Sequence, residues 1–429
     1  MSRCAASTSC AAAVAIASLA VVHMRAIVPQ TGVPSAFELP APGGPYPVGT
    51  TSWRLTDASR QETFATTGEP RQVEVIAWYP AAGSRRGALA PYLREGLAEV
   101  RAFASVLRAP RAVFDGLENV RTHAEIDAPP RVAPRKLPLL LFGHGYTAIP
   151  SAYTALLEDL ASHGYAVLSV VHPYEAAAAT LADGRVVSML TPAGTLLPPI
   201  ADVLGEWRAE DETMAAVTNT DDGAEQLRLL REYLSGLTRT EAALRRWVDD
   251  TKLVLDRLSA VPPRSAAARL VAALDATRVG ALGHSMGGVT AAQFCAEDRR
   301  CRAGLNLDGI PQYGAMIDAT PPRPFLMVYS ARPGRLGASD AIYRRAARPY
   351  YRVDVPDTRH LDFCDMTFWG GPLRERPVLG TMAPDRVTAI TRASVRGFFD
   401  QEMLGERAAL SRGLAPFPEV AMKTVVPAR

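Results

Sequence analysis

The residues from Gly283 to Gly288 have the types and spacing that nucleophilic catalysis requires. A mostly apolar run at 279–282 leads into Gly-His-Ser-Met-Gly-Gly, and small residues dominate at 289–294. This order predicts a strand, a sharp turn and a helix that holds the Ser285 hydroxyl at its N-terminus. Glycines flank the serine because the turn is strained and the helix must pass close to the strand. A structural turn without chemistry is the alternative, and the flanking elements favour a nucleophile.

A serine hydroxyl attacks an ester only with a base within hydrogen-bond reach, and that base needs an acid to orient it. When the serine sits between a strand and a helix in this way, the acid and then the histidine follow it along the chain. His360 is the one histidine of seven that follows Ser285, and it lies in a loop directly after a predicted strand at 350–355. We therefore predict that His360 is the general base.

The acid has more candidates. The carboxylates between the serine and the histidine are Glu297, Asp298, Asp308, Asp318, Asp340, Asp354 and Asp357. Asp308 directly follows a predicted strand at 304–307, so it would leave the carboxyl end of that strand beside the site. An ordinary Asp-Gly turn is the alternative interpretation of Asp308 with Gly309. Asp340, in the loop region after the next strand at 325–329, is the reserve candidate.

The negative charge that develops on the substrate oxygen needs two amide donors. We assign one to Met286, which follows the serine at the helix N-terminus, and the other to Tyr146, in a glycine-containing loop at 143–146. The Tyr146 ring is expected to line the acyl pocket. His144 and His284 flank tight turns, and we expect them to hydrogen-bond loops together.

Composition excludes several function classes. The chain has 429 residues and a formal net charge of +3, with 47 basic and 44 acidic side chains and 48% hydrophobic residues. No basic run or basic stripe with interleaved aromatic residues occurs, so we expect no nucleic-acid partner. No spacing of Cys and His suggests a metal site, and we expect no metal and no cofactor.

Residues 1–26 read as a signal peptide or an N-terminal anchor. Residues 11–22 are continuously small or apolar, too short for a comfortable membrane span but as long as the core of a signal peptide. The protein is then periplasmic, secreted or membrane-anchored. The alternative is a cytoplasmic protein whose true start is Met24. Cys295 and Cys301 are close enough in sequence to pair after export, although we expect buried thiols there.

The remaining chain reads as one catalytic domain. A Pro- and Gly-rich segment at 27–49 is a linker and the loop that leads into this domain, which spans 50–404, and 405–429 is a C-terminal tail. Strands are expected at 71–79, 137–142, 166–171, 304–307, 325–329 and 350–355, and helices at 91–120 (interrupted at Pro110), 151–163 and 386–404. The β, α, β order predicts a mostly parallel central sheet with helices on both faces, an α/β fold.

A helical insertion at 173–263 interrupts this alternation before Ser285. It contains two expected helices, and Thr238 with Glu241 reads as a capping box for the second. The insertion is a lid or a sheet-covering segment, and its narrow apolar stripe favours covering.

Several motifs together resemble the platelet-activating factor acetylhydrolase family, within the dienelactone-hydrolase and polyester-hydrolase group of α/β-hydrolases. They are Gly44-Pro45-Tyr46-Pro47-Val48-Gly49, Phe142-Gly143-His144-Gly145, Leu160-Ala161-Ser162-His163-Gly164-Tyr165, the segment around Ser285, Leu307-Asp308, and His360 with Asp365-Met366-Thr367-Phe368. The resemblance covers roughly 44–399 in element order. In that family the acid stands at the Leu-Asp position, which supports Asp308 over Asp340.

The resemblance implies a serine carboxylic-ester hydrolase that acts on short-chain acyl esters of phospholipids without a cofactor. The loop at 145–148 and Met286 are similar to those of cutinase-like polyester hydrolases, so a general carboxylesterase or polyester hydrolase is the alternative. A non-catalytic binding protein of the same fold is a second alternative. The expected partners are a small-molecule or lipid ester and a lipid surface; the sequence leaves the oligomeric state open. Phe363, Phe368 and Trp369 either line an apolar mouth beside His360 or belong to the core.

Overall fold

The computed structural model describes residues 37–426, except 66–67, 84–86, 133–134, 310–316, 370–372 and 374–377. The predicted leader at 1–26 and the first part of the linker, 27–36, lie outside the described residues. Within the described part, the segment that leads into the domain packs against the end of the helix that finishes at Ser162. The Tyr46 amide donates to the Ser162 carbonyl at 3.1 Å, and a Cβ at Gly44 would lie 2.2 Å from the same oxygen. Residues 43–46 are therefore packed closely onto the domain.

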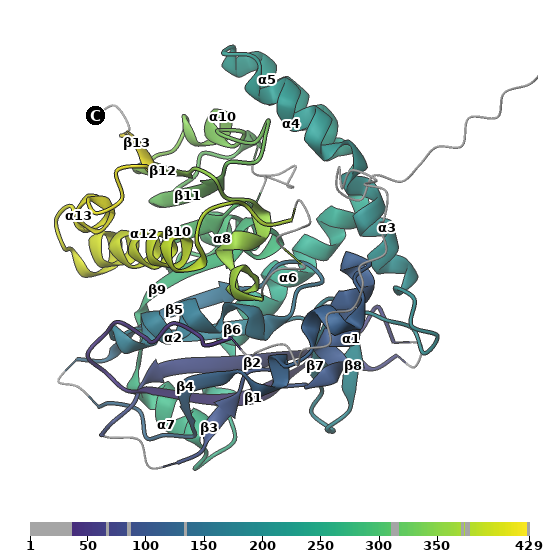
Figure 1. Cartoon of the computed structure of the whole chain (residues 1–429), viewed down its shortest axis with the longest axis vertical. Helices are drawn as coiled ribbons and strands as arrows, with labels where there is room; N and C mark the ends of the chain where they lie inside the picture. Colours follow the sequence, from purple (N-terminus) through teal and green to yellow (C-terminus); the bar gives the residue numbers. More distant parts are fainter. Residues whose placement is uncertain are drawn as a thin grey trace, which may run out of the picture.

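An eleven-stranded sheet runs through the molecule in the order β13-β12-β11-β10-β9-β5-β6-β2-β1-β4-β3 (Figure 1). The strands from β12 to β6 are parallel to their neighbours, whereas β2, β1 and β13 pair antiparallel to β6, β2 and β12. This arrangement confirms the predicted mostly parallel α/β fold. The strands are β1 Val48–Gln61, β2 Pro70–Pro80, β3 Leu89–Pro91, β4 Arg121–Ile126, β5 Leu137–Gly143, β6 Ala166–Val171, β9 Leu274–His284, β10 Cys301–Leu307, β11 Phe325–Ser330, β12 Tyr350–Val355 and β13 Ala421–Val425.

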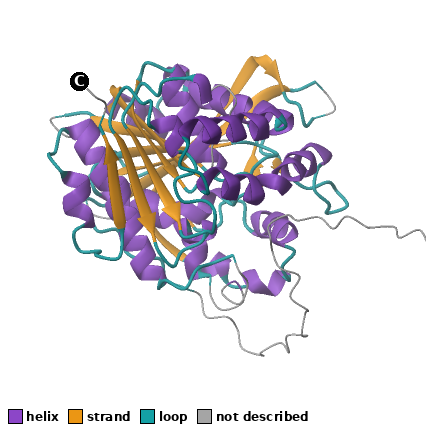
Figure 2. Ribbon diagram, turned by 90° about the horizontal axis from the view of Figure 1, so that it is seen from above, coloured by secondary structure: helices purple, strands orange, loops and turns teal. Residues whose placement is uncertain are grey.

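Helices cover both faces of this twisted sheet (Figure 2). Alternate strand residues point to opposite faces, so that Val73 and Val75 join one hydrophobic cluster while Ile76 and Trp78 join the other. The first cluster also contains side chains of α6 (Thr238–Asp256), α7 (Ala266–Ala273) and α8 (Met286–Glu297), and the second contains those of α2 (Thr154–Ser162) and α12 (Pro384–Leu404). Further helices are α1 Leu97–Leu107, α10 Asp340–Tyr343 and α13 Ala409–Leu414, with 3-10 turns at Arg111–Phe114, Leu117–Asn119, Pro150–Tyr153, Trp207–Ala209, Leu258–Ala260, His360–Phe363 and Asp365–Phe368.

Residues 173–263 form a larger helical segment than the sequence predicts. Two short strands, β7 (Ala178–Thr180) and β8 (Val186–Ser188), precede α3 (Pro198–Glu206), α4 (Glu210–Thr218), α5 (Gly223–Ser235) and α6, so the expectation of two helices is wrong. Helix α6 covers the sheet, as expected, while α4 and α5 extend away from it (Figure 1).

The predicted capping box of Thr238 and Glu241 is also wrong. The side chain of Glu206, at the end of α3, instead accepts from the Arg239 and Thr240 amides, each at 2.8 Å. A carboxylate at this helix end satisfies free amides and complements the helix dipole, so the local sequence pattern is not needed there.

Two elements at the C-terminal end were not expected. After α12 the chain forms α13 and then β13, which pairs with β12 at the sheet edge, with Val425 opposite Tyr350. The exposed side chains of β13 carry no apolar alternation, which is why no strand pattern is visible in the sequence.

A disulfide joins Cys295 of α8 to Cys301 of β10, with the Cα atoms 5.0 Å apart. The expectation of two buried thiols is therefore wrong. A short connection returns the chain from the helix to the strand, so the two side chains face each other. Cys364 is a buried, free cysteine.

We expect peptide mapping of the unreduced protein to recover Cys295 and Cys301 in one linked peptide and Cys364 as a free thiol. Replacing both Cys295 and Cys301 with Ala should lower the free energy of unfolding by about 2 kcal/mol, measured by urea titration, because the crosslink restricts the unfolded chain. Alkylation of all three cysteines without a reductant, or no change in stability, would contradict the disulfide.

Candidate active site

Ser285 sits in a strained backbone conformation between β9 and α8. Its φ is 55° and its ψ is −124°, a region that L-residues rarely adopt, and Met286 begins the helix. The Ser285 amide donates to the Leu307 carbonyl of β10 at 2.9 Å, and the Ser285 carbonyl accepts from Gly288 and Val289. These bonds hold the partly exposed serine at the carboxyl edge of the sheet.

The glycines of this turn are required by close backbone contacts. A Cβ at Gly287 would lie 2.1 Å from the Gly143 carbonyl oxygen, and one at Gly283 would lie 2.3 Å from the Gly287 carbonyl carbon. A Cβ at Gly309 would lie 2.2 Å from the Ser285 carbonyl oxygen. Contacts this short require glycine, so the predicted close approach of strand, turn and helix is present.

Asp308 leaves the end of β10 with a positive φ of 54°. Its carboxylate accepts from the Ser330 amide at 2.7 Å, the Ser330 hydroxyl at 2.9 Å and His360 Nδ1 at 2.8 Å. Burial alone would raise its pKa, but the hydrogen bonds from His360 and Ser330 lower the pKa of this carboxyl below its ordinary value. Asp308 is therefore an anion directed at the histidine.

His360 begins the 3-10 turn that follows β12. Because Asp308 is a carboxylate, His360 Nδ1 carries a proton and donates it, which leaves Nε2 of the neutral ring as an acceptor. The side chain is 28% exposed, whereas that of Asp308 is 4% exposed. The His360 ring can thus reach solvent or substrate, whereas the Asp308 carboxylate is shielded from solvent.

Asp340, the reserve candidate, does not meet His360. Its carboxylate accepts from the Tyr350 hydroxyl at 2.8 Å and pairs with Arg352 at 2.7 Å. These contacts join α10 to β12, so the structure favours Asp308 as the orienting acid.

The predicted oxyanion donors, the Tyr146 and Met286 amides, belong to two segments that meet beside Ser285, since a Cβ at Gly145 would lie 3.5 Å from that of Ser285. Met286 lies at the N-terminus of α8, and Tyr146 lies in the loop that follows β5. Among the described residues, neither amide donates to a protein acceptor, so both are free to bind a developing oxyanion. The Tyr146 ring is buried, with its centroid 5.6 Å from Trp207 and 5.8 Å from Trp247. It packs against the insertion.

The two predicted loop histidines make the expected contacts. His144 Nε2 accepts from the His172 amide at 3.4 Å while its Nδ1 bonds to the adjacent Gly145 carbonyl at 2.7 Å, and His284 Nε2 bonds to the His360 carbonyl at 2.8 Å. Burial together with the positive charge of a neighbouring histidine lowers the pKa of each to about 3, so both rings are neutral near pH 7.

A buried charged cluster behind the Tyr146 loop was not recognised in the sequence. Arg71 of β2 pairs with Asp250 of α6 at 2.7 Å, and Asp250 accepts from His172 at 2.8 Å. Arg246, also on α6, pairs with Glu175 at 2.6 Å. The Thr147 amide donates to the Glu175 carbonyl, so this cluster reaches the Tyr146 loop.

A pattern in α6 could have revealed this cluster. Arg246 and Asp250 stand four residues apart, on one face of the helix. The sequence alone does not show that Arg71, within a strand of mostly apolar inward residues, reaches that face.

The aromatic residues after His360 belong mainly to the core. Phe363 and Trp369 are buried, and the Trp369 ring packs edge-on against Phe103 and Phe114. Phe368 is only partly buried and stacks on Phe37 with centroids 6.1 Å apart. The structure thus favours the core alternative for Phe363 and Trp369 over an apolar mouth.

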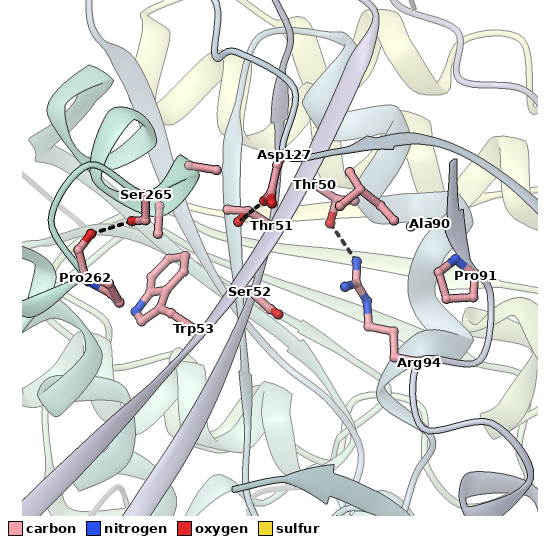
Figure 3. A pocket seen from close by; sticks show the side chains of 13 residues that line it. Thr50, Thr51, Ser52, Trp53, Ala90, Pro91, Arg94, Asp127, Pro262 and Ser265 are labelled. Atoms are coloured by element: carbon pink, nitrogen blue, oxygen red, sulfur yellow. Dashed lines mark hydrogen bonds between the residues drawn. The ribbon is translucent and has the colours of Figure 1, made fainter. Parts of the chain in front are cut away.

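A cavity of about 250 Å³ lies beside β1 (Figure 3). The hydrogen bonds drawn at its wall in Figure 3 run from Arg94 to Thr50 and from Thr51 to Asp127, each 2.6 Å long, and from the Ser265 hydroxyl to the Pro262 carbonyl. None of Ser285, Asp308, His360, Tyr146 and Met286 lines it. This cavity is distinct from the candidate active site.

The described residues contain neither a metal-binding cluster nor a helix able to span a membrane. In that part of the chain no group of three or more His, Cys, Asp and Glu side chains is placed to hold a metal ion. No helix there is both long and apolar enough to cross a bilayer.

Asp365 anchors the turn that follows His360. Its buried carboxyl accepts from the Ala155 amide and the Tyr92 hydroxyl, each at 3.3 Å. Burial raises the pKa of this carboxyl to about 7, although these hydrogen bonds oppose the shift.

The chain is similar to known ester hydrolases. The model of the family described as "Platelet-activating factor acetylhydrolase, isoform II" matches residues 31–192. The platelet-activating factor acetylhydrolase of Cavia porcellus is 25% identical over 343 residues, which cover 78% of this chain and 70% of the relative. A protein of Arthroderma benhamiae named probable 1-alkyl-2-acetylglycerophosphocholine esterase is 22% identical over 426 residues, covering 91% of this chain and 95% of the relative.

A solved structure shares the fold. The ferulic acid esterase from Streptomyces cinnamoneus superimposes with a TM-score of 0.66 and 29% identity, covering 90% of this chain and 99% of that one. Together these matches confirm the family resemblance that the motifs indicate and the α/β-hydrolase fold.

The raised pKa of Asp365 predicts a specific pH dependence of stability. Between pH 3.8 and about 7 the unfolded carboxyl loses its proton while the folded one keeps it, so this group costs stability as pH rises through that window. The stability of Asp365→Asn relative to wild type should therefore rise by roughly 1–3 kcal/mol from pH 4.5 to pH 7.5. Denaturant titrations of both proteins at the two pH values measure the difference in free energy of unfolding between Asp365→Asn and wild type. The contributions of other titrating groups cancel in this difference. A difference that stays flat would contradict the burial of an ionisable Asp365.

Proposed function

We propose that this carboxylic ester hydrolase, which is similar to the platelet-activating factor acetylhydrolase family of α/β-hydrolases, acts through an acyl-enzyme formed at Ser285. The observation that carries the proposal is the strained Ser285 turn beside the hydrogen-bonded pair of Asp308 and His360. Without a reacting serine, neither the strain nor a buried carboxylate aimed at a partly exposed imidazole is needed.

In the first step His360 Nε2 takes the Ser285 proton as the hydroxyl oxygen attacks the ester carbonyl. Asp308 keeps Nδ1 protonated, so that Nε2 faces the serine, and it stabilises the imidazolium that forms. Its bonds to Ser330 fix the carboxylate, which therefore needs no reorganisation during the step.

The tetrahedral intermediate places its negative oxygen between the Tyr146 and Met286 amides. The α8 dipole adds favourable potential at Met286. His360 then donates its proton to the leaving alcohol, and the acyl group stays on Ser285. Water, deprotonated by the same imidazole, hydrolyses this acyl-enzyme and restores the free serine.

Ser285→Ala and His360→Ala should each lower kcat by several orders of magnitude, because each removes a group that changes bonding in the first step. Asp340→Ala is the matched control: it removes a carboxylate of the same region whose partners are Tyr350 and Arg352, so kcat should stay within a few-fold. Ester turnover measured per folded molecule checks both. An inactive Asp340→Ala together with an active Asp308→Ala would overturn the assignment of the acid.

For the substrate we propose short-chain acyl esters of phospholipids. The names of the relatives, an acetylhydrolase and an alkyl-acetyl-glycerophosphocholine esterase, support this class. The Tyr146 ring packs against Trp207 of the insertion, with centroids 5.6 Å apart, and we propose that this aromatic pair limits the length of the acyl group. The ferulic acid esterase neighbour favours a second candidate, a general or polyester carboxylesterase.

A panel of substrates separates these candidates. Phosphatidylcholines with two-, four-, eight- and sixteen-carbon sn-2 chains should give a kcat/KM that falls at least tenfold from the shortest to the longest chain, because the long chain does not fit beside the aromatic rings. p-Nitrophenyl esters of matched chain length are the control for intrinsic reactivity. Turnover of p-nitrophenyl or feruloyl esters without turnover of any phospholipid would move the function to the second candidate.

We also infer that the protein is exported and works at a lipid surface. The Cys295–Cys301 disulfide supports an oxidising compartment. Cell fractionation with N-terminal sequencing tests this point: a cytoplasmic protein that retains residues 1–26 and a reduced pair would contradict it.

A further inference from the structure

A buried tyrosine joins the Tyr146 loop to the turn at Ser285. Tyr153 ends the 3-10 turn before α2, and its side chain is 1% exposed. Its hydroxyl oxygen lies 3.0 Å from the Gly145 amide nitrogen and 2.9 Å from His284 Nδ1. Gly145 precedes Tyr146 and His284 precedes Ser285, so one hydroxyl contacts the immediate neighbours of a proposed oxyanion donor and of the proposed nucleophile.

The chain of hydrogen bonds continues to the proposed base. His284 Nε2 lies 2.8 Å from the main-chain carbonyl oxygen of His360, and the two imidazole centroids are 4.4 Å apart. Each of the three segments that carry the proposed chemistry is therefore bound to the same pair of side chains, Tyr153 and His284.

Only one assignment of protons is compatible with these hydrogen bonds. The Gly145 amide can only donate, so the Tyr153 oxygen accepts from it. The His360 carbonyl can only accept, so His284 Nε2 carries a proton. In the neutral ring Nδ1 is then an acceptor, and it receives the Tyr153 hydroxyl proton. Burial favours this neutral ring, which agrees with the low pKa of His284.

We call the hydrogen-bonded series Gly145, Tyr153, His284 and His360 the relay. Packing restricts the movement of its side chains. The Tyr153 ring lies against Phe142 of β5, with centroids 4.9 Å apart, and against His284 at 5.7 Å. Phe142 is buried in the sheet core. The hydroxyl is therefore fixed relative to the strand from which the Tyr146 loop departs.

We propose that Tyr153, acting through His284, is a positioning residue that sets the distance between the oxyanion loop, the Ser285 turn and the His360 main chain. This inference rests on the proposed function. Tyr153 contacts no reacting atom in this scheme; it acts by holding the Tyr146 amide where the oxyanion forms. Preorganised donors act only when they are held near the oxyanion position, so a loosened loop loses transition-state stabilisation more than ground-state binding.

Tyr153→Phe removes the hydroxyl and keeps the ring. It leaves the Gly145 amide and His284 Nδ1 without their shared partner, which frees the Tyr146 loop. We expect kcat to fall about 10- to 100-fold with KM within about twofold, because the loss concerns the transition state. The affinity for an alkyl boronic acid, which forms a tetrahedral adduct with the serine, should fall in parallel with kcat.

Tyr165→Phe is the matched control. Tyr165 is also fully buried, and its hydroxyl donates to Asp400 at 2.7 Å, outside the relay. The control should lose stability as Tyr153→Phe does while kcat and boronate affinity stay near the wild-type values. Fluorophosphonate labelling counts the active serines in each preparation, so that kcat refers to folded enzyme.

His284→Gln is a second variant for the same relay. The fold-loss of kcat in the double variant should be smaller than the product of the losses in His284→Gln and Tyr153→Phe, because both substitutions break the same series of hydrogen bonds. A kcat for Tyr153→Phe within twofold of wild type, or independent multiplication in the double variant, would overturn the relay. If the wild-type protein neither takes the label nor hydrolyses any ester, the proposed function is wrong. The positioning role of Tyr153, which rests on that function, is then wrong as well.

Discussion

The contact between two glycine backbones is the constraint on which the candidate site depends. Gly287, in the first turn of α8, approaches the Gly143 carbonyl so closely that a Cβ would lie 2.1 Å from that oxygen. This approach brings the loop after β5, which carries Tyr146, against the start of α8, where Met286 follows Ser285. The strained backbone of Ser285 is maintained by the same packing together with the bond from its amide to Leu307.

Charged and polar side chains stabilise the loops that this contact brings together. Asp308 is fixed by Ser330 before it meets His360. Behind the Tyr146 loop, Arg71 and Asp250 form a buried pair whose desolvation is offset by several further bonds. Asp250 and Arg246 come from α6, so the helical insertion contributes to the geometry of the site in addition to covering the sheet. Polar groups buried in this way favour one arrangement of the loops over alternatives.

The sequence predicted those parts that depend on local pattern and chain order. The apolar runs of β5 and β6 and the glycines around Ser285 are local signals, and the order of serine, acid and histidine is a signal of chain order. The disulfide, β13, the Glu206 cap of α6 and the Tyr153 relay depend on segments that meet only after folding. Tyr153 reads as an ordinary core aromatic, and nothing near it in sequence indicates that its hydroxyl contacts residues 145 and 284. The sequence favoured Asp308 over the reserve candidate Asp340, and the hydrogen bond between His360 Nδ1 and Asp308 supports that choice.

The central claim is that Ser285 is the nucleophile and carries the acyl group after the first step. Detection of this acyl-enzyme tests the claim most directly. The protein is mixed with a short-chain p-nitrophenyl ester, quenched in acid within milliseconds, digested and analysed by mass spectrometry. We expect the peptide that contains Ser285 to carry the mass of the acyl group, with the modification assigned to that serine, and to lose it as turnover ends. Ester hydrolysis with an unmodified Ser285, or with the acyl group on another residue, would contradict the account.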